Sequence, residues 1–346
     1  TPLFVMLVAE LARWTGVDDT VRRLMPAVDR ALAWMSEFGD LDGDGFIEYL
    51  RSDEGGLQNQ GWKDSWDGIR HRDGTVARGA IALAEAQGYA YAAYRGRADL
   101  ARALDEPTGA AAEWDRAADE LRDRFDDAFW LDEAGWYAVG LDGDKQPIGS
   151  LTSNIGHLLW TGIALDSRAR SIASHLEGDA LFSGWGLRTL ASHNPGYNPL
   201  SYHCGSVWPH DTAIAVAGLA RYGFDDAVAR VSLGLLDAAE ATDGRLPELF
   251  AGFGREDLPF PVPYPASCSP QAWSAASPLL IARSVLGFDP DLPNERVTLR
   301  PRLPPGIDEL HLENVPLGNL RIDVRVDGPE AAVHGLPGEI EVVHDG

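Results

Sequence analysis

The sequence predicts a mainly α-helical chain that ends in a small β-rich segment. Before about Gly287, apolar residues recur at helical spacing in several stretches. After Gly287, Pro290, Pro293, Pro301, Pro304 and Pro305 interrupt any helix, and two segments with alternating apolar residues, 310–315 and 320–326, are predicted as strands. Of the 346 residues, 45% are hydrophobic, which is enough for a substantial core. We therefore expect a helical domain over residues 1–287 and a β-rich segment over 288–346.

The helical expectation rests on apolar stripes. In residues 1–14, Leu3, Leu7, Leu11 and Trp14 lie on one face of a helix. Further helices are expected at about residues 18–38, 75–95, 108–128, 151–164, 182–192, 210–222, 225–241 and 270–286. Several of these are close neighbours in sequence, as the two helices of a hairpin are. Trp185 falls inside one of them and is expected to be a core residue.

The charge of the chain limits its partners. Fifty-three acidic and 29 basic side chains give a formal net charge of −24. Such a field repels nucleic-acid phosphates and anionic lipid, so we expect neither as a partner. No run of 18 apolar residues is present, which argues against a membrane-spanning helix. A neutral sugar is indifferent to this field.

Cysteine usage and the start of the chain add two expectations. The two cysteines, Cys204 and Cys268, lack metal-ligand spacing. They are expected to be free and buried in a cytoplasmic protein, although one disulfide is the alternative. The sequence begins at Thr1 inside a predicted helix, so we expect it to be part of a longer chain.

The segment GWKDSWD, Gly61–Asp67, combines two indoles and two carboxylates within seven residues. Sugar rings have an apolar C–H face and a polar rim, so their sites pair aromatic side chains with carboxylates and amides. The plainer interpretation is that the tryptophans belong to the core and that the aspartates cap helices.

A second candidate carboxylate is Glu248, in the segment RLPELFAGF at residues 245–253. Its apolar neighbours would raise its pKa and suit acid–base chemistry. A helix-capping or ion-paired role is the alternative.

Two further segments, YHCGSVWPHD at 202–211 and YPASCSPQAWS at 264–274, mix aromatic, imidazole and amide groups with prolines. His203 and His210 have no metal-ligand spacing around them. A serine hydrolase built from Ser206, His210 and Asp211 is disfavoured because the G-x-S-x-G motif is absent.

These four segments occur in the order seen in bacterial amylo-α-1,6-glucosidase-like proteins, which the chain resembles. The segments SNIGHLLWTGI (153–163) and LFSGWGLRTLAS (181–192) are also similar to that group. The resemblance implies an (α/α)6 barrel of six helical hairpins, with the sugar pocket formed by loops at one end. It also implies an upstream β-rich domain. We predict nine or ten helices rather than twelve, so the first hairpins are expected to be missing here.

The resemblance implies an inverting glycoside hydrolase that cleaves α-glucosidic linkages in glycogen or oligosaccharides. It places the general acid at Asp64, with Asp67 as a close rival, and the general base at Glu248. In inverting enzymes the two carboxyl groups lie about 6.5–9.5 Å apart, with water between. The expected sugar contacts are Trp62, Lys63, Trp66, His203, Trp208, Gln271 and Trp273. No cofactor is required.

The acidic loop Asp40–Glu48 is a candidate calcium site. Asp40, Asp42, Asp44 and Phe46 occupy alternate positions, as the oxygen ligands of a calcium loop do. Position 12 of an EF-hand would be occupied here by an arginine, so this is no EF-hand, but Glu48 at position 9 could close the site. The alternative is a solvated acidic turn.

Three other functions stay open at this point. A trehalase-like or other small-substrate α-glucosidase is the nearest alternative. A non-catalytic carbohydrate-binding barrel would keep the aromatic residues without two correctly spaced carboxyl groups. A sugar epimerase or lyase would use His203 and His210 at the reacting carbon.

Overall fold

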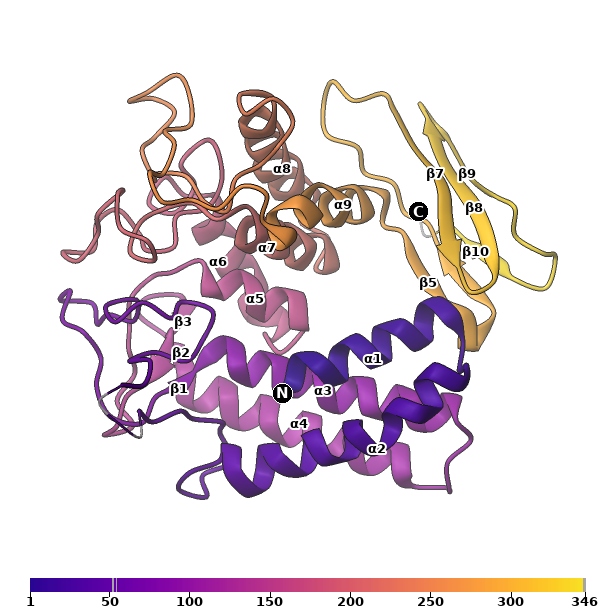
Figure 1. Cartoon of the computed structure of the whole chain (residues 1–346), viewed down its shortest axis with the longest axis horizontal. Helices are drawn as coiled ribbons and strands as arrows, with labels where there is room; N and C mark the ends of the chain where they lie inside the picture. Colours follow the sequence, from indigo (N-terminus) through magenta and orange to yellow (C-terminus); the bar gives the residue numbers. More distant parts are fainter. Residues whose placement is uncertain (52, 54, 345–346) are drawn as a thin grey trace. The chain divides into compact units, whose positions relative to one another are not determined.

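The computed structural model describes residues 1–51, 53 and 55–344, and helices are their main regular structure (Figure 1). The α-helices in these residues are α1 (Pro2–Thr15), α2 (Asp19–Trp34), α3 (Ala84–Ala103), α4 (Ala110–Phe129), α5 (Asn154–Thr161), α6 (Asp166–Glu177), α7 (Pro209–Arg221), α8 (Asp225–Glu240) and α9 (Ala272–Leu286). A π-helical turn, Met35–Gly39, continues α2, and a 3-10 turn, Leu292–Asn294, follows β5.

The strands are short except near the C-terminus. In the middle of the chain, β1 (Ala82–Leu83) pairs with β4 (Gly140–Leu141), and β2 (Trp130–Leu131) pairs with β3 (Trp136–Tyr137). The C-terminal strands are β5 (Asp289–Asp291), β6 (Arg296–Thr298), β7 (Glu309–Leu317), β8 (Leu320–Asp327), β9 (Glu330–His334) and β10 (Glu341–Val343). They form two sheets, with strand orders β10-β6-β5 and β7-β8-β9.

The chain divides into two compact units. The first comprises residues 1–37, 89–120 and 282–346, and the second comprises residues 38–88 and 121–281. This grouping differs from the boundary expected near Gly287, so the division into 1–287 and 288–346 stays a prediction.

In the first unit, α1 packs against α2. The carboxylate of Asp18 caps α2 by accepting a hydrogen bond from the backbone N–H of Val21 at 2.8 Å. Strands β7, β8 and β9 lie side by side in yellow in Figure 1, as a purely antiparallel sheet. Alternating residues of β8, namely Ile322, Val324 and Val326, are buried in a core. The two predicted C-terminal strands are thus confirmed.

In the second unit, α5 and α7 approach each other closely. A Cβ added at Gly156 would lie 2.5 Å from the Cβ of Ala215, and one added at Gly218 would lie 2.6 Å from the backbone N of Trp160. Only glycine fits at such contacts. The two helices carry residues that meet in the site described below.

Three helix predictions need correction. Residues 182–192 form no helix, because Gly184 has a φ of +88° and Phe182 bridges Leu187 across a turn. Trp185 in this turn is nevertheless buried, at 4% exposure. The helix expected at 75–95 begins only at Ala84, since β1 precedes it.

The third correction is α6, which was not predicted. Its buried residues are Ala169, Ile172, Ala173 and Leu176, which follow helical spacing. Two of them are small alanines, and Leu176 lies beside Glu177, so the apolar stripe is weak in the sequence. The mainly helical class with small β segments is confirmed, whereas closure of the helices into an (α/α)6 barrel stays a prediction.

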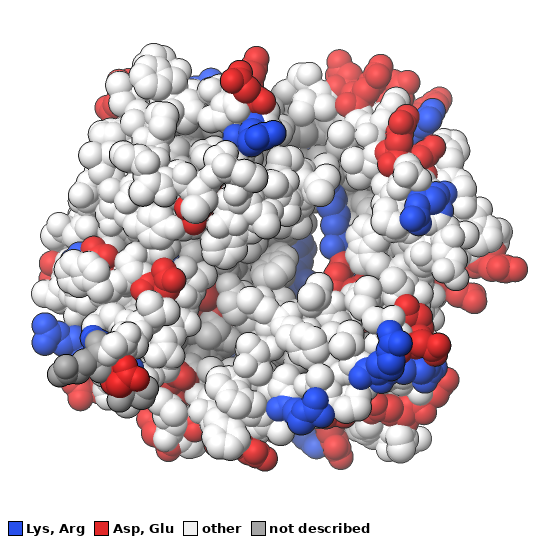
Figure 2. Space-filling view, in the orientation of Figure 1, with Lys and Arg blue, Asp and Glu red and all other residues white. Residues whose placement is uncertain are grey.

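Charge is spread over the surface. The face drawn in Figure 2 carries acidic side chains in several separate places, with basic side chains beside some of them. Among the described residues, no helix is both long and apolar enough to cross a membrane. Both cysteines are free, as expected, but only Cys204 is buried, and Cys268 is exposed.

Candidate active site

Trp62 lies at the centre of an aromatic cluster in the second unit. Its indole stacks on the imidazole of His157, with ring centroids 5.9 Å apart and planes at 5°. Three further rings meet it edge-on: His203 at 5.6 Å, Trp208 at 5.8 Å and His210 at 5.1 Å. His157 belongs to α5 and His210 to α7, so the cluster ties the loop 61–67 to both helices.

The cluster continues toward solvent through Trp273. Its ring stacks on that of His210 at a centroid distance of 4.0 Å, and the residue is 41% exposed. Trp66 is 69% exposed, whereas Trp208 is only 2% exposed. An exposed indole presents a flat apolar surface to the C–H face of a sugar. Trp66 and Trp273 are therefore positioned to contact a ligand, whereas Trp208 supports the cluster from within.

Glu248 is buried, and three donors hold its carboxylate. The Tyr202 hydroxyl donates to Oε1 at 2.8 Å, and the backbone N–H of Cys268 donates to Oε2 at 3.1 Å. The amide of Gln271 reaches Oε1 at 3.4 Å. Burial alone raises the pKa of Glu248, but hydrogen bonds from Cys268, Tyr202 and Gln271 outweigh it and lower the pKa below its ordinary value. The pKa shift expected from the apolar sequence was therefore wrong in sign.

The backbone places Glu248 beside the 202–211 segment. Val207 and Phe250 exchange two backbone hydrogen bonds, of 2.9 and 3.0 Å. The backbone N–H of Glu248 donates to the carbonyl of Cys268 at 3.0 Å. Glu248 is thus held between two loops that are distant in sequence.

Asp64 lies next to residues that contact Glu248. Its Oδ1 is 4.0 Å from Nδ1 of His203, and its side chain is 54% exposed. Burial raises the pKa of Tyr202, and the neighbouring charges of Glu248 and Asp64 raise it further. Both carboxyl groups therefore act on the same phenol, although they are 184 residues apart in sequence.

Asp67 has a different environment. Its Oδ2 accepts a hydrogen bond from Nη2 of Arg70 at 2.9 Å in an ion pair. Arg70 also donates to the carbonyl of Gly74 at 2.8 Å, and the thiol of Cys204 donates to the backbone carbonyl of Asp67 at 3.1 Å. Asp67 is therefore fixed by a cation, whereas the side chain of Asp64 is more exposed.

Lys63 does not occupy the position expected of a sugar ligand. It is 1% exposed, and its ammonium donates to Oδ1 of Asn154 at 2.5 Å and to the carbonyl of Thr189 at 2.6 Å. Burial lowers the pKa of Lys63 to about 8 against the opposing charges of Asp211 and Glu85. Its side chain supports the loop from inside, which corrects the predicted sugar contact.

Two buried groups at this site were missed by sequence reasoning. His157 Nε2 lies 2.8 Å from Asp211 Oδ1, and both side chains are at most 1% exposed. Burial raises the pKa of Glu85, which is 1% exposed. Glu85 is the single charged residue between Arg78 and Arg95, and that isolation was an available signal.

Two imidazoles of the site, those of His203 and His210, have lowered pKa values. Burial, followed by the charge of Lys63, lowers the pKa of His203 to about 3, and burial lowers the pKa of His210 to about 4. The hydroxyl of Ser206 donates to the carbonyl of Tyr202 at 2.6 Å, while the carboxylate of Asp211 pairs with His157. These partners give no support to a triad of Ser206, His210 and Asp211.

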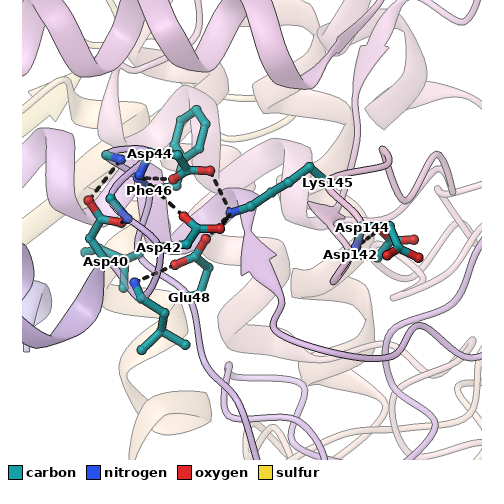
Figure 3. A network of polar contacts seen from close by, with 12 residues as sticks. Asp40, Asp42, Asp44, Phe46, Glu48, Asp142, Asp144 and Lys145 are labelled. Atoms are coloured by element: carbon teal, nitrogen blue, oxygen red, sulfur yellow. Dashed lines mark hydrogen bonds and ion pairs between the residues drawn. The ribbon is translucent and has the colours of Figure 1, made fainter.

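The acidic loop gathers four carboxylates, from Asp40, Asp42, Asp44 and Glu48, whose ligand atoms lie within 4.8 Å of one another. Oxygen donors of this kind suit a hard cation such as calcium. However, the ammonium of Lys145 forms ion pairs with three of them (Figure 3). Calcium ligation, including that by Phe46, stays a prediction.

The chain contains a glycoside hydrolase domain. A family model described as the mannosylglycerate hydrolase MGH1-like glycoside hydrolase domain matches residues 1–252, and the chain belongs to this family. The matched region includes both Asp64 and Glu248. The narrower amylo-α-1,6-glucosidase assignment is not confirmed, and no curated protein sequence matches the chain.

Solved structures show the same fold at low sequence identity. A chain described as a sialidase is 13% identical with a TM-score of 0.76, covering 96% of this chain and 31% of its own. A GH63 mannosylglycerate hydrolase from Thermus thermophilus, in complex with Tris, is 18% identical with a TM-score of 0.59, covering 81% and 75%. Neutral trehalase Nth1 from Saccharomyces cerevisiae is 20% identical with a TM-score of 0.50, covering 78% and 50%. This chain thus spans about a third of the length of the sialidase chain and about half of the length of the trehalase chain.

Replacing Tyr202 by Phe should raise the pKa of Glu248, because the hydroxyl that stabilises the carboxylate is lost. The measurement is a carbon-13 NMR titration of the Glu248 carboxyl group. Tyr264→Phe is a matched control, since the Tyr264 ring lies 5.7 Å from that of Tyr202 but is not among the described donors to Glu248. An unchanged pKa in Tyr202→Phe would show that the phenol does not stabilise the anion.

Proposed function

We propose that this chain is the catalytic part of an inverting α-glycosidase, with Glu248 as general base and Asp64 as general acid. Inversion needs one carboxylic acid to protonate the leaving oxygen and one carboxylate to activate water. The observation that carries the proposal is the hydrogen-bonded carboxylate of Glu248 beside Tyr202, with Asp64 next to the same residues.

The charge state of Glu248 supports its role as the base. A base must be ionised before it can take a proton from water, and three hydrogen bonds favour the ionised form. The same bonds orient the carboxylate rigidly. A group held in this way is a poor proton donor, so the acid must be sought elsewhere.

Asp64 is the better-placed acid. Its half-exposed carboxyl group can reach the oxygen of a bound glycoside, whereas that of Asp67 is bound to Arg70. The neutral imidazole of His203 lies beside Asp64 and adds no positive charge that would oppose protonation. An epimerase using His203 and His210 would need imidazoles that exchange protons near neutral pH, which the low pKa values of both residues disfavour.

The charges around the site favour a neutral substrate. Mannosylglycerate, named as the substrate of one relative, carries a carboxylate on its glycerate part. Here Asp64, Asp67 and Glu248 are acidic, and Arg70 is already paired. An added anion would be repelled. We therefore extend the proposal to neutral α-glucosides, including α-1,6 branch points, with trehalose-like substrates as the alternative.

Glu248→Gln should lower the hydrolysis rate by about 100-fold or more, because an amide cannot take a proton from water. Rates are compared with that of the unsubstituted protein, with Glu256→Gln as a control at an exposed acid of the following loop. Circular dichroism checks the fold of both variants. A Glu248→Gln variant within a few-fold of the parent would remove Glu248 from the mechanism and favour a sugar-binding role.

Asp64→Asn should be inactive on natural glucosides but partly active on aryl glucosides whose leaving group needs no protonation. Asp67→Asn should weaken the binding of both kinds of substrate alike, because the substitution breaks the ion pair with Arg70 and loosens the loop 61–67. The measurement is kcat/KM for each pair of variant and substrate. The opposite pattern would transfer the acid role to Asp67.

The parent protein should hydrolyse α-1,6-linked glucosides faster than mannosylglycerate, because the acidic site repels an anionic aglycone. Initial rates on isomaltose, trehalose and mannosylglycerate measure this preference. Proton NMR of the fresh product gives the anomer, and inversion of an α-linkage releases the β-sugar. Fastest hydrolysis of mannosylglycerate would refute the neutral-substrate proposal, and an α-product from an aryl α-glucoside, whose leaving group is not a sugar, would refute inversion.

A further inference from the structure

Lysine is rare in this chain. Only two of its 29 basic residues are lysines, Lys63 and Lys145, and the others are arginines. Lys63 is buried under the candidate active site, as described above. Lys145 lies in the turn after β4, and its side chain extends to the acidic loop Asp40–Glu48 (Figure 3). This loop and this turn are both in the second unit.

The ammonium of Lys145 has one N–H donor for each of the three carboxylates that it contacts. Its Nζ lies 2.8 Å from Oδ2 of Asp42 and 2.6 Å from Oδ2 of Asp44, and it also pairs with Oε1 of Glu48. An ammonium has three N–H donors, one for each of these carboxylates. The planar fork of an arginine cannot direct its donors at three converging groups in this way.

The remaining oxygens of the loop have backbone partners. Asp40 accepts hydrogen bonds from the N–H groups of Gly43 at 2.7 Å and Gly45 at 2.9 Å. The second oxygen of Glu48 accepts one from Leu41 at 2.9 Å. Calcium takes about six to eight oxygen ligands, so binding it here would require displacing the ammonium of Lys145.

The charge of Lys145 is needed most at Glu48. The Glu48 side chain is 1% exposed, and an unpaired carboxylate at that depth is strongly destabilising. Burial lowers the pKa of Lys145, but its bonds to Asp42, Asp44 and Glu48 outweigh burial and raise the pKa. The contacts with Asp42, Asp44 and Glu48 therefore hold the ammonium at this position.

The loop also continues toward the candidate active site. Tyr49, next to Glu48, donates its hydroxyl hydrogen to Oδ1 of Asn59 at 2.7 Å. The amide of Asn59 donates to the carbonyl of Ser65 at 2.6 Å. Ser65 follows Asp64, so two hydrogen bonds link the residue after the acidic loop to the segment that contains Asp64.

We infer that Lys145 is a built-in cation of the acidic loop, which takes the position a calcium ion would hold and makes the loop independent of metal. This role does not depend on the proposed glycosidase activity. It assigns the loop a stabilising function and Lys145 a function that no arginine of the chain can replace.

The test is thermal unfolding of the whole chain in EDTA and in about 5 mM CaCl2, a concentration above the dissociation constants of weak calcium sites. The wild-type protein should unfold at the same Tm in both. Lys145→Met should lose about 5 °C in EDTA, because three carboxylates are left unpaired, and should regain much of this in calcium. Lys145→Arg should lose less than Lys145→Met and should respond weakly to calcium.

Arg325→Met is the control, since it removes a surface cation whose ion pairs are 3.9 Å long. It should change neither the Tm nor the calcium response. A wild-type Tm that falls in EDTA and recovers in calcium would overturn the inference in favour of a metal-requiring loop. An unchanged Tm for Lys145→Met in EDTA would also overturn it. If Lys145→Met does not fold, the wild-type response and Lys145→Arg still decide.

Discussion

The ammonium of Lys63 lies where water does not reach it, between an amide oxygen of α5 and the carbonyl of Thr189. A buried cation is tolerated only when its donors are satisfied, so these bonds fix the backbone of the loop 61–67 against two distant segments. Trp62 and Asp64 flank Lys63 in sequence and are oriented by it. The aromatic cluster and the position of Asp64 both depend on this one buried charge.

The three carboxyl groups near the site differ in environment more than in chemistry. Glu248 is ordered by neutral donors and Asp67 by a cation, whereas Asp64 is 54% exposed and its Oδ1 lies 4.0 Å from His203. Hydrogen bonds from neutral groups orient an anion without cancelling its charge, whereas a cation neutralises it. A pair of acids can therefore take opposite roles in one site, because their partners differ.

Patterns in the local sequence predicted the elements whose formation depends mainly on residues that are close together in the chain. The helices α1 and α2, the alternating strands β7 and β8, and the association of tryptophan with acid in Gly61–Asp67 all follow from short-range patterns. The face expected to be buried in α1 was wrong in part, because Leu3 and Leu7 are 49% and 66% exposed. The turn at Gly184 was misread as a helix because its residues are apolar. In the structure Phe182 bridges Leu187 across the turn, so these apolar residues do not lie on one face of a helix.

The environment of each acid could not be predicted in the same way. The donors to Glu248 come from Tyr202 and Cys268, and the pairing of His157 with Asp211 joins two helices. Such contacts exist only after the chain has folded. Apolar neighbours in sequence therefore indicated burial of Glu248 correctly but could not give the sign of its pKa shift.

The glycine contacts between α5 and α7 have a mechanical consequence. With backbone packed directly on backbone at Gly156 and Gly218, neither helix can rotate or slide without a steric clash. The two helices therefore move as one rigid body, and the distance between His157 and Asp211 is preserved during thermal motion. A ligand would therefore meet side chains that lie outside this contact, such as the exposed indole of Trp66 in the loop 61–67 and that of Trp273 at the start of α9.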